Sequence, residues 1–119
     1  MTTGSLTTHV LDTARGRPAA GVKVALYRVS GNRRAKIAEA VTNGDGRTEG
    51  PMLAGRGFTA GVYELVFAAG DYLRATGQAA GEGMFLDEIP IRFGVSDAGA
   101  HYHVPLLISP FAYSTYRGG

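Results

Sequence analysis

Residues 22–29 read VKVALYRV, a run dominated by β-branched and aromatic side chains. Such side chains fit the pleated, half-buried surface of a β-strand. Turn-forming residues bound the run, with residues 15–18 (RGRP) before it and residues 30–32 (SGN) after it. Residues 22–29 are therefore predicted to form a strand, and they are the clearest strand in the sequence.

Short segments of the same character recur on both sides of this run. Alternation of apolar and polar side chains with a period of two indicates a strand with one buried face. The further segments that we predict as strands are residues 6–12, 35–42, 61–68, 89–95, 101–109 and 111–117. Residues 35–42 are rich in alanine, so their composition is also compatible with a helix. Pro90 is expected at the beginning of its strand or in an edge strand.

The fold class follows from these segments and from the many turn-forming residues. The 119 residues include eighteen glycines and five prolines, which favours short strands over long helices. One short helix is predicted at residues 71–78, with Asp71 as its N-cap and Gly77 at its end. About eight strands and one helix predict an all-β protein, a Greek-key sandwich of two antiparallel sheets. The length suits a single domain, residues 1–119.

Charge and composition exclude several classes of function. The formal net charge is +2 and the basic residues are scattered, so nucleic acid is not expected as a partner. The densest basic cluster, residues 33–36, is predicted to be a solvated hairpin turn. The chain has no cysteine, which excludes disulfides and thiolate sites. No apolar run is long enough to cross a membrane, and no basic region precedes an apolar run at the N-terminus, so we expect a cytoplasmic protein.

The residues best suited to acid–base chemistry are the three histidines, His9, His101 and His103. In a strand, His101 and His103 lie on the same face, because side chains alternate with a period of two. Imidazole exchanges a proton near neutral pH, as a general acid or base requires. Two turn dipeptides at residues 43–46 (NGDG) precede Arg47, which is therefore expected to project from a well-fixed loop.

The same three histidines leave a metal site open as an alternative, because a His-x-His strand with a third histidine is a ligand set of some zinc enzymes. No carboxylate or cysteine lies within the His-x-His strand to support it. Neither a Gly-x-Ser-x-Gly motif nor a P-loop is present, so covalent serine catalysis and nucleotide hydrolysis have no motif here.

Beyond these local patterns, several motifs resemble the transthyretin-related 5-hydroxyisourate hydrolases. The matching segments are residues 6–12 (LTTHVLD), 16–19 (GRPA), 42–47 (TNGDGR), 88–91 (EIPI), 101–110 (HYHVPLLISP) and 113–118 (YSTYRG). The resemblance spans essentially the whole chain. Its C-terminal motifs resemble the signature that separates these hydrolases from transthyretin, a hormone carrier.

The resemblance implies a transthyretin-like sandwich and a homotetramer with active sites in the channel where two dimers meet. It implies a hydrolase that opens the ring of 5-hydroxyisourate, a small purine-derived substrate of urate degradation. The implied product is 2-oxo-4-hydroxy-4-carboxy-5-ureidoimidazoline, formed without a metal or cofactor.

The resemblance also implies a set of site residues. The implied catalytic residues are His9, Arg47 and His103, and the implied substrate-binding residues are Arg47, Tyr116, Arg117, Gly118 and Gly119. Which histidine is the general base stays open, and His101 is interpreted as a supporting or surface residue. Gly119 departs from the family, which carries serine at this position. A carrier of an aromatic ligand and a general sandwich binding module are the alternatives to an enzyme.

Overall fold

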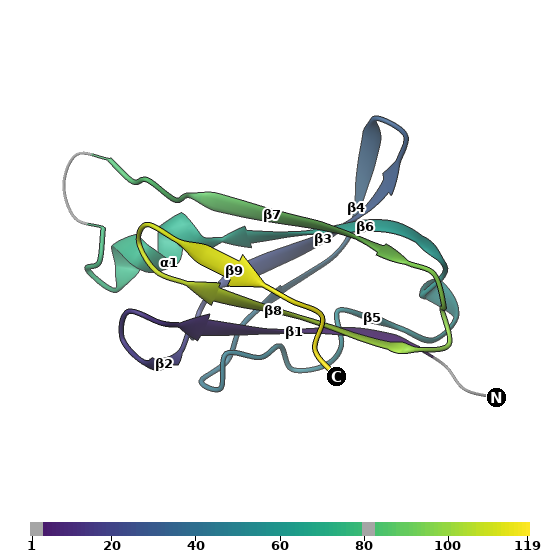
Figure 1. The fold of residues 1–119 in the computed structure, drawn as a ribbon, viewed down its shortest axis with the longest axis horizontal. Helices are drawn as coiled ribbons and strands as arrows, with labels where there is room; N and C mark the ends of the chain where they lie inside the picture. Colours follow the sequence, from purple (N-terminus) through teal and green to yellow (C-terminus); the bar gives the residue numbers. More distant parts are fainter. Residues whose placement is uncertain (1–3, 80–82) are drawn as a thin grey trace.

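The computed structural model describes residues 4–79 and 83–119, and it shows two β-sheets stacked face to face (Figure 1). The strands are β1 (Ser5–Asp12), β2 (Arg17–Pro18), β3 (Lys23–Ser30), β4 (Arg33–Val41), β5 (Leu53–Ala54), β6 (Gly61–Ala68), β7 (Glu88–Val95), β8 (His101–Ile108) and β9 (Tyr113–Thr115). One sheet has the order β4–β3–β6–β7, and the other has the order β2–β1–β8–β9 with β5 also paired to β1. The predicted all-β sandwich is confirmed.

The core lies between the sheets and is built from the inward faces of the alternating strands. Its largest fully buried side chains include Tyr63 and Phe67 of β6 and Leu106 of β8. Burying a side chain of this size contributes about 1.5–3 kcal/mol. Pro90 lies in β7, which is an edge strand as predicted, because proline cannot donate a ladder hydrogen bond.

The direction of one strand pair differs from the prediction of two antiparallel sheets. Strands β1 and β8 run parallel and pair over their whole lengths, from Ser5 beside His101 to Asp12 beside Ile108. These strands come from opposite ends of the chain, and the whole second sheet lies between them in sequence. No tight hairpin therefore dictates their relative direction.

The one α-helix among the described residues, α1 (Ala69–Ala75), starts earlier than predicted, and a short 3₁₀ turn, η1 (Gly55–Gly57), precedes β6. The N-cap is Ala68 without a side-chain hydrogen bond, so the prediction of Asp71 as N-cap was wrong. The helix continues directly from β6, and Asp71 instead pairs with Arg74 in the next turn. Gly77 has a φ of +74°, a conformation that ends helices, as predicted. No helix among the described residues is long and apolar enough to cross a membrane.

A buried carboxylate ties α1 to β1. Asp12 accepts hydrogen bonds from Tyr72 (2.6 Å), the Gln78 amide (2.9 Å) and the Arg15 backbone N–H (2.9 Å). Burial opposes ionisation of Asp12, but these three bonds outweigh it and its pKa is lowered. Burial and the bond to Asp12 raise the pKa of Tyr72 to about 12. The ionised carboxylate therefore anchors the helix to the sheet that carries the histidines.

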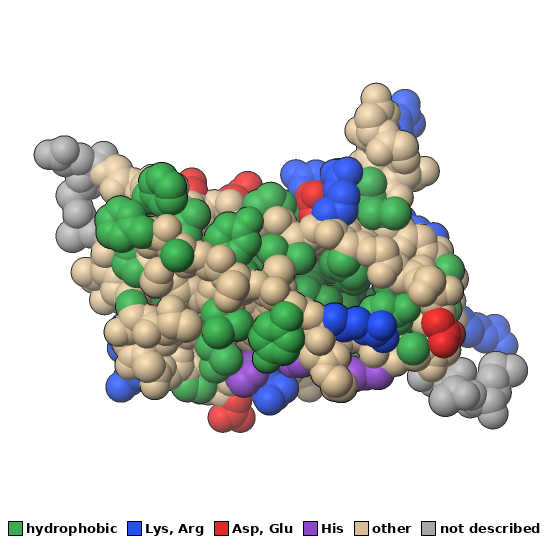
Figure 2. All heavy atoms as spheres, viewed as in Figure 1, with side chains coloured by type: hydrophobic (Ala, Val, Ile, Leu, Met, Phe, Trp, Pro, Cys, Tyr) green, Lys and Arg blue, Asp and Glu red, His purple; other side chains and the backbone are tan. Residues whose placement is uncertain are grey.

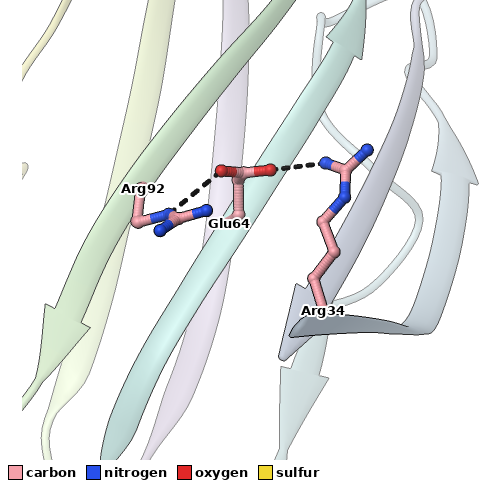
Figure 3. Close-up of polar contacts among 3 residues, drawn as sticks. All are labelled: Arg34, Glu64 and Arg92. Atoms are coloured by element: carbon pink, nitrogen blue, oxygen red, sulfur yellow. Dashed lines mark hydrogen bonds and ion pairs between the residues drawn. The ribbon is translucent and has the colours of Figure 1, made fainter. Parts of the chain in front are cut away.

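The second buried carboxylate lies on the other sheet. Glu64 of β6 lies between Arg34 of β4 (2.5 Å) and Arg92 of β7 (3.1 Å), as Figure 3 shows. Residues 33–36 are thus the first residues of β4 rather than the predicted hairpin turn. The strand extends this far because Arg33 to Lys36 pair with β3 up to Ser30.

Candidate active site

The site begins with the outward faces of β1 and β8. The core-facing residues of these strands are Leu6, Thr8, Val10 and Asp12 of β1 and Tyr102, Val104, Leu106 and Ile108 of β8, all of them buried. The alternate residues face outward, and the parallel register places Thr7 beside His103 and Ser5 beside His101. His9 lies two residues beyond Thr7 on this face, about 7 Å along the strand.

Arg47 reaches this face through backbone pairing. The loop before it closes with hydrogen bonds between the backbones of Asn43 and Gly46 (2.9 Å) and of Asn43 and Arg47 (2.8 Å). Gly46 has a φ of +76° and accepts a hydrogen bond from the backbone N–H of Val10 (2.8 Å). This contact makes Arg47 the antiparallel partner of His9. Directly opposed residues point to the same face, so the guanidinium and the imidazole project together.

The tautomer of His9 follows from its hydrogen bond to the same loop. Its Nε2 lies 2.8 Å from the backbone carbonyl oxygen of Asp45. A carbonyl oxygen only accepts, so Nε2 carries the hydrogen and donates it. In the neutral ring, Nδ1 is then bare and able to accept a proton.

His103 is half-buried and held on its Nδ1 side, where the hydroxyl of Thr7 lies 2.8 Å away. Burial lowers the pKa of His103, and Coulombic repulsion of its imidazolium by Arg47, and to a smaller extent by the His9 and His101 rings, lowers it further. The imidazole is therefore neutral at physiological pH, as a general base must be.

The C-terminal segment returns from β9 along β8 and packs against His103 (Figure 1). The backbone N–H of Gly118 donates to the carbonyl oxygen of His103 at 2.7 Å. A β-carbon on Gly118 would lie 2.6 Å from Cδ2 of the His103 ring, so only glycine fits at this position without displacing the ring. At Gly119 no atom would lie within 4 Å of an added β-carbon.

These elements surround a hollow of about 520 Å³ on the outward face of the sheet. Its lining residues are Thr7, Thr8, Arg47, Thr48, Gly50, Pro51, His101, His103 and Gly119. Figure 2 shows the histidine side chains along the lower edge of the molecule, beside basic side chains. The volume falls within the range of about 300–1,000 Å³ that is common for small-molecule sites.

Two of the predicted substrate-binding residues lie elsewhere in the single chain. Tyr116 and Arg117 line a separate hollow of about 360 Å³ between β7 and β8. The guanidinium of Arg117 stacks 4.1 Å from the ring centroid of Tyr102. The structure thus brings His103, Arg47 and Gly119 to one hollow, with His9 paired to Arg47 and Gly118 against His103.

Sequence reasoning missed the polar residues that join the histidines. His101 stacks beside His103 with 6.3 Å between ring centroids, and Thr7 lies between the two rings. The sequence signal available was the alternation within residues 6–12, because Thr7 lies two residues before His9 and shares its face. The contact of Thr7 with the other two histidines depends on the register of β1 against β8. Among the described residues, no group of three or more histidine, aspartate or glutamate side chains is arranged to hold a metal ion.

Fold and site together define a two-sheet β-sandwich with an imidazole- and guanidinium-lined hollow on the outward face of one sheet. The chain belongs to the HIUase/Transthyretin family, whose sequence model matches residues 6–118. A 5-hydroxyisourate hydrolase of Mesorhizobium japonicum is 62% identical to it over 115 residues, covering 97% of this chain and 92% of that protein.

Solved structures share the fold at different levels of identity. The crystal structure of (S)-allantoin synthase matches with a TM-score of 0.92 and 47% identity over 99% of this chain, which spans only 44% of that chain. Sea bream transthyretin in complex with thyroxine matches with a TM-score of 0.85 and 27% identity, covering 96% of this chain and 94% of that one. The fold is therefore common to proteins with different functions. The sequence identity is higher to the hydrolase, at 62%, than to transthyretin, at 27%.

Proposed function

We propose that this chain is a hydrolase that opens the ring of 5-hydroxyisourate to 2-oxo-4-hydroxy-4-carboxy-5-ureidoimidazoline in urate degradation. The observation that carries the proposal is the half-buried imidazole of His103, whose pKa is lowered by burial and by Arg47, in one hollow with the Arg47 guanidinium. The 62% identity to a protein named as this hydrolase supports the same substrate.

The reaction needs three groups, and the site offers each of them. A base must deprotonate water, a cation must stabilise the oxyanion that develops, and an acid must protonate the departing ring nitrogen. His9 presents a bare Nδ1 and His103 is a neutral imidazole, so these two residues activate water and return the proton. Arg47 holds the electron-rich ring through paired hydrogen bonds. No metal or cofactor takes part in this scheme.

The C-terminal segment completes the substrate site. The backbone of Gly118 packs against the ring of His103, and Gly119 lines the hollow. In the proposed homotetramer, the outward faces of the histidine-bearing sheets meet at the interface between two dimers. Tyr116 and Arg117 contribute to substrate binding in that assembly. Static light scattering tests the assembly, and a fully active monomer would contradict it.

A carrier of an aromatic ligand is the alternative function. The similarity in fold to transthyretin does not favour it, because both functions occur on this sandwich. The acid–base pair and the arginine favour an enzyme, since a carrier needs no neutral imidazole beside a cation.

The deciding experiment adds the purified chain to freshly generated 5-hydroxyisourate and follows the decay of its ultraviolet absorbance. We expect decay much faster than the spontaneous reaction, unchanged after prolonged chelation. His103→Ala should reduce the acceleration by about 10²–10⁴-fold, whereas Arg56→Ala, an exposed change in η1, should not change it. If the wild-type protein does not accelerate the decay, the result would favour the carrier function over the hydrolase. Loss of activity on chelation would favour the zinc alternative.

A further inference from the structure

A continuous row of hydrogen-bonding groups leads away from His103 toward solvent. The Thr7 hydroxyl lies 2.8 Å from Nδ1 of His103 and 3.2 Å from Nε2 of His101. The Ser5 hydroxyl lies 2.6 Å from Nδ1 of His101. His103 is half-buried, whereas His101 is exposed. The row therefore joins a half-buried imidazole to an exposed one, both of which line the hollow.

The single hydroxyl hydrogen of Thr7 restricts which ring nitrogens of the two histidines can carry a hydrogen. Thr7 has one hydroxyl hydrogen, so it donates to one imidazole and accepts from the other. If it accepts from Nδ1–H of His103, it donates to a bare Nε2 of His101. If it donates to Nδ1 of His103, it accepts from Nε2–H of His101. The two neutral histidines therefore share the same tautomer, both Nδ1–H or both Nε2–H, and Thr7 couples them.

The two arrangements correspond to two roles of His103. With hydrogens on Nδ1, His103 presents a bare Nε2 and is ready to act as a base. With hydrogens on Nε2, it presents a donor and is ready to act as an acid. The catalytic cycle of a hydrolase needs the first form for the attack of water and the second form for the departure of the leaving group.

We propose that Thr7 and His101 are positioning residues that form a proton relay behind His103. The inference rests on the proposed hydrolase function. Nε2 of His103 takes a proton from water, leaving hydroxide, while Nδ1 releases its hydrogen to the Thr7 oxygen. The original Thr7 hydrogen passes to Nε2 of His101, which becomes an imidazolium that donates its Nδ1–H to Ser5. His103 is left neutral with hydrogen on Nε2.

The second half of the cycle runs in reverse. His103 gives the Nε2 hydrogen to the departing ring nitrogen, and Thr7 returns a hydrogen to Nδ1 as His101 gives its proton back. Every N–H and O–H bond of His101, His103 and Thr7 is thereby restored, so the cycle consumes only the substrate and one water molecule. Moving the positive charge to His101 takes it out of a half-buried position beside Arg47, where burial and the guanidinium both disfavour an imidazolium. His101 is exposed in the single chain and lines the hollow, so water in the hollow stabilises that charge.

A first experiment measures kcat and KM for three threonine variants. Thr7→Val keeps the shape of the side chain but removes the hydroxyl, Thr7→Ser keeps the hydroxyl, and Thr13→Val removes a hydroxyl that bonds the Ile108 carbonyl outside the site. We expect Thr7→Val to lower kcat by about 10- to 100-fold with KM unchanged, less than the roughly 10²–10⁴-fold expected for loss of the acid–base group itself. Thr7→Ser should restore kcat, and Thr13→Val should leave it unchanged.

A second experiment needs no activity and reads the tautomers directly. Two-dimensional ¹H–¹⁵N spectra of the histidine rings distinguish Nδ1–H from Nε2–H in the substrate-free protein. We expect the same tautomer at His101 and His103 in the wild type, and loss of this correspondence in Thr7→Val. Opposite tautomers in the wild type, or full kcat in folded Thr7→Val, would overturn the relay. A wild type with coupled tautomers but no hydrolysis would instead refute the proposed function and, with it, the relay in catalysis.

Discussion

The imidazole of His103 rests directly on the backbone of Gly118, with Cδ2 only 2.6 Å from the position that a β-carbon at residue 118 would occupy. The same two residues are joined by a 2.7 Å hydrogen bond from the Gly118 N–H to the His103 carbonyl oxygen. The C-terminal segment therefore fixes the ring from one side while Thr7 holds Nδ1 from the other.

Gly118→Ala should displace the His103 ring and lower kcat, because an added methyl group cannot share the space of the imidazole. Steady-state kinetics checks this, with circular dichroism to establish that the variant is folded. Gly119→Ser is the matched control, since no atom lies within 4 Å of an added β-carbon there. We expect Gly119→Ser to change turnover little, because one neutral hydrogen bond contributes only about 0.5–1.5 kcal/mol. Equal losses in both variants would contradict this role of Gly118.

Single substitutions of the proposed catalytic residues should each reduce kcat/KM by about 10²–10⁴-fold without unfolding the protein. The variants are His9→Ala, His103→Ala and Arg47→Ala, assayed with 5-hydroxyisourate and compared by thermal melting. Near-normal activity in either histidine variant would show that its imidazole does not transfer the proton.

Removing the charge of residue 47 should raise the pKa of His103. Burial is the largest cause of the lowered pKa, and the Arg47 charge adds to it, so Arg47→Gln removes only the second contribution. The acid limb of any residual activity should move to higher pH in the variant. Titration of the His103 ring by NMR measures the shift, and an unchanged or lower pKa would show that the two groups do not interact.

Tyr72→Phe should lower the free energy of unfolding by about 1.5–3 kcal/mol, because the buried Asp12 carboxylate loses a charge-assisted hydrogen bond. The folded-state pKa of Asp12 lies below its ordinary value of 3.8. Its stabilising contribution is therefore complete above that ordinary value and is lost as the pH falls through the folded-state pKa. Urea denaturation at neutral and at strongly acidic pH checks both points. A destabilisation that does not shrink in acid would contradict the role of the ionised carboxylate.

Local sequence patterns determined most of the strands, because side-chain alternation and turn residues act over a few neighbouring residues. Residues 61–68 were predicted as a strand with the bounds that β6 has in the structure. The NGDG turn was predicted from its dipeptides, and the structure places Gly46 there with a positive φ. The helix start at Ala69 was missed because the helix continues directly from β6 and its N-cap, Ala68, has no capping side chain that a sequence pattern could reveal.

The sequence by itself determined that His101 and His103 share a strand face and that Arg47 leaves a tight turn, since both follow from local geometry. Only the tertiary structure decided that β1 pairs with β8 in parallel, which sets Thr7 between the two histidines. The pairing of His9 with Arg47 and of His103 with Gly118 also joins residues far apart in sequence. The paired strands are neighbours in one sheet, and their register is fixed when their apolar faces are buried together, a condition that no short segment imposes by itself.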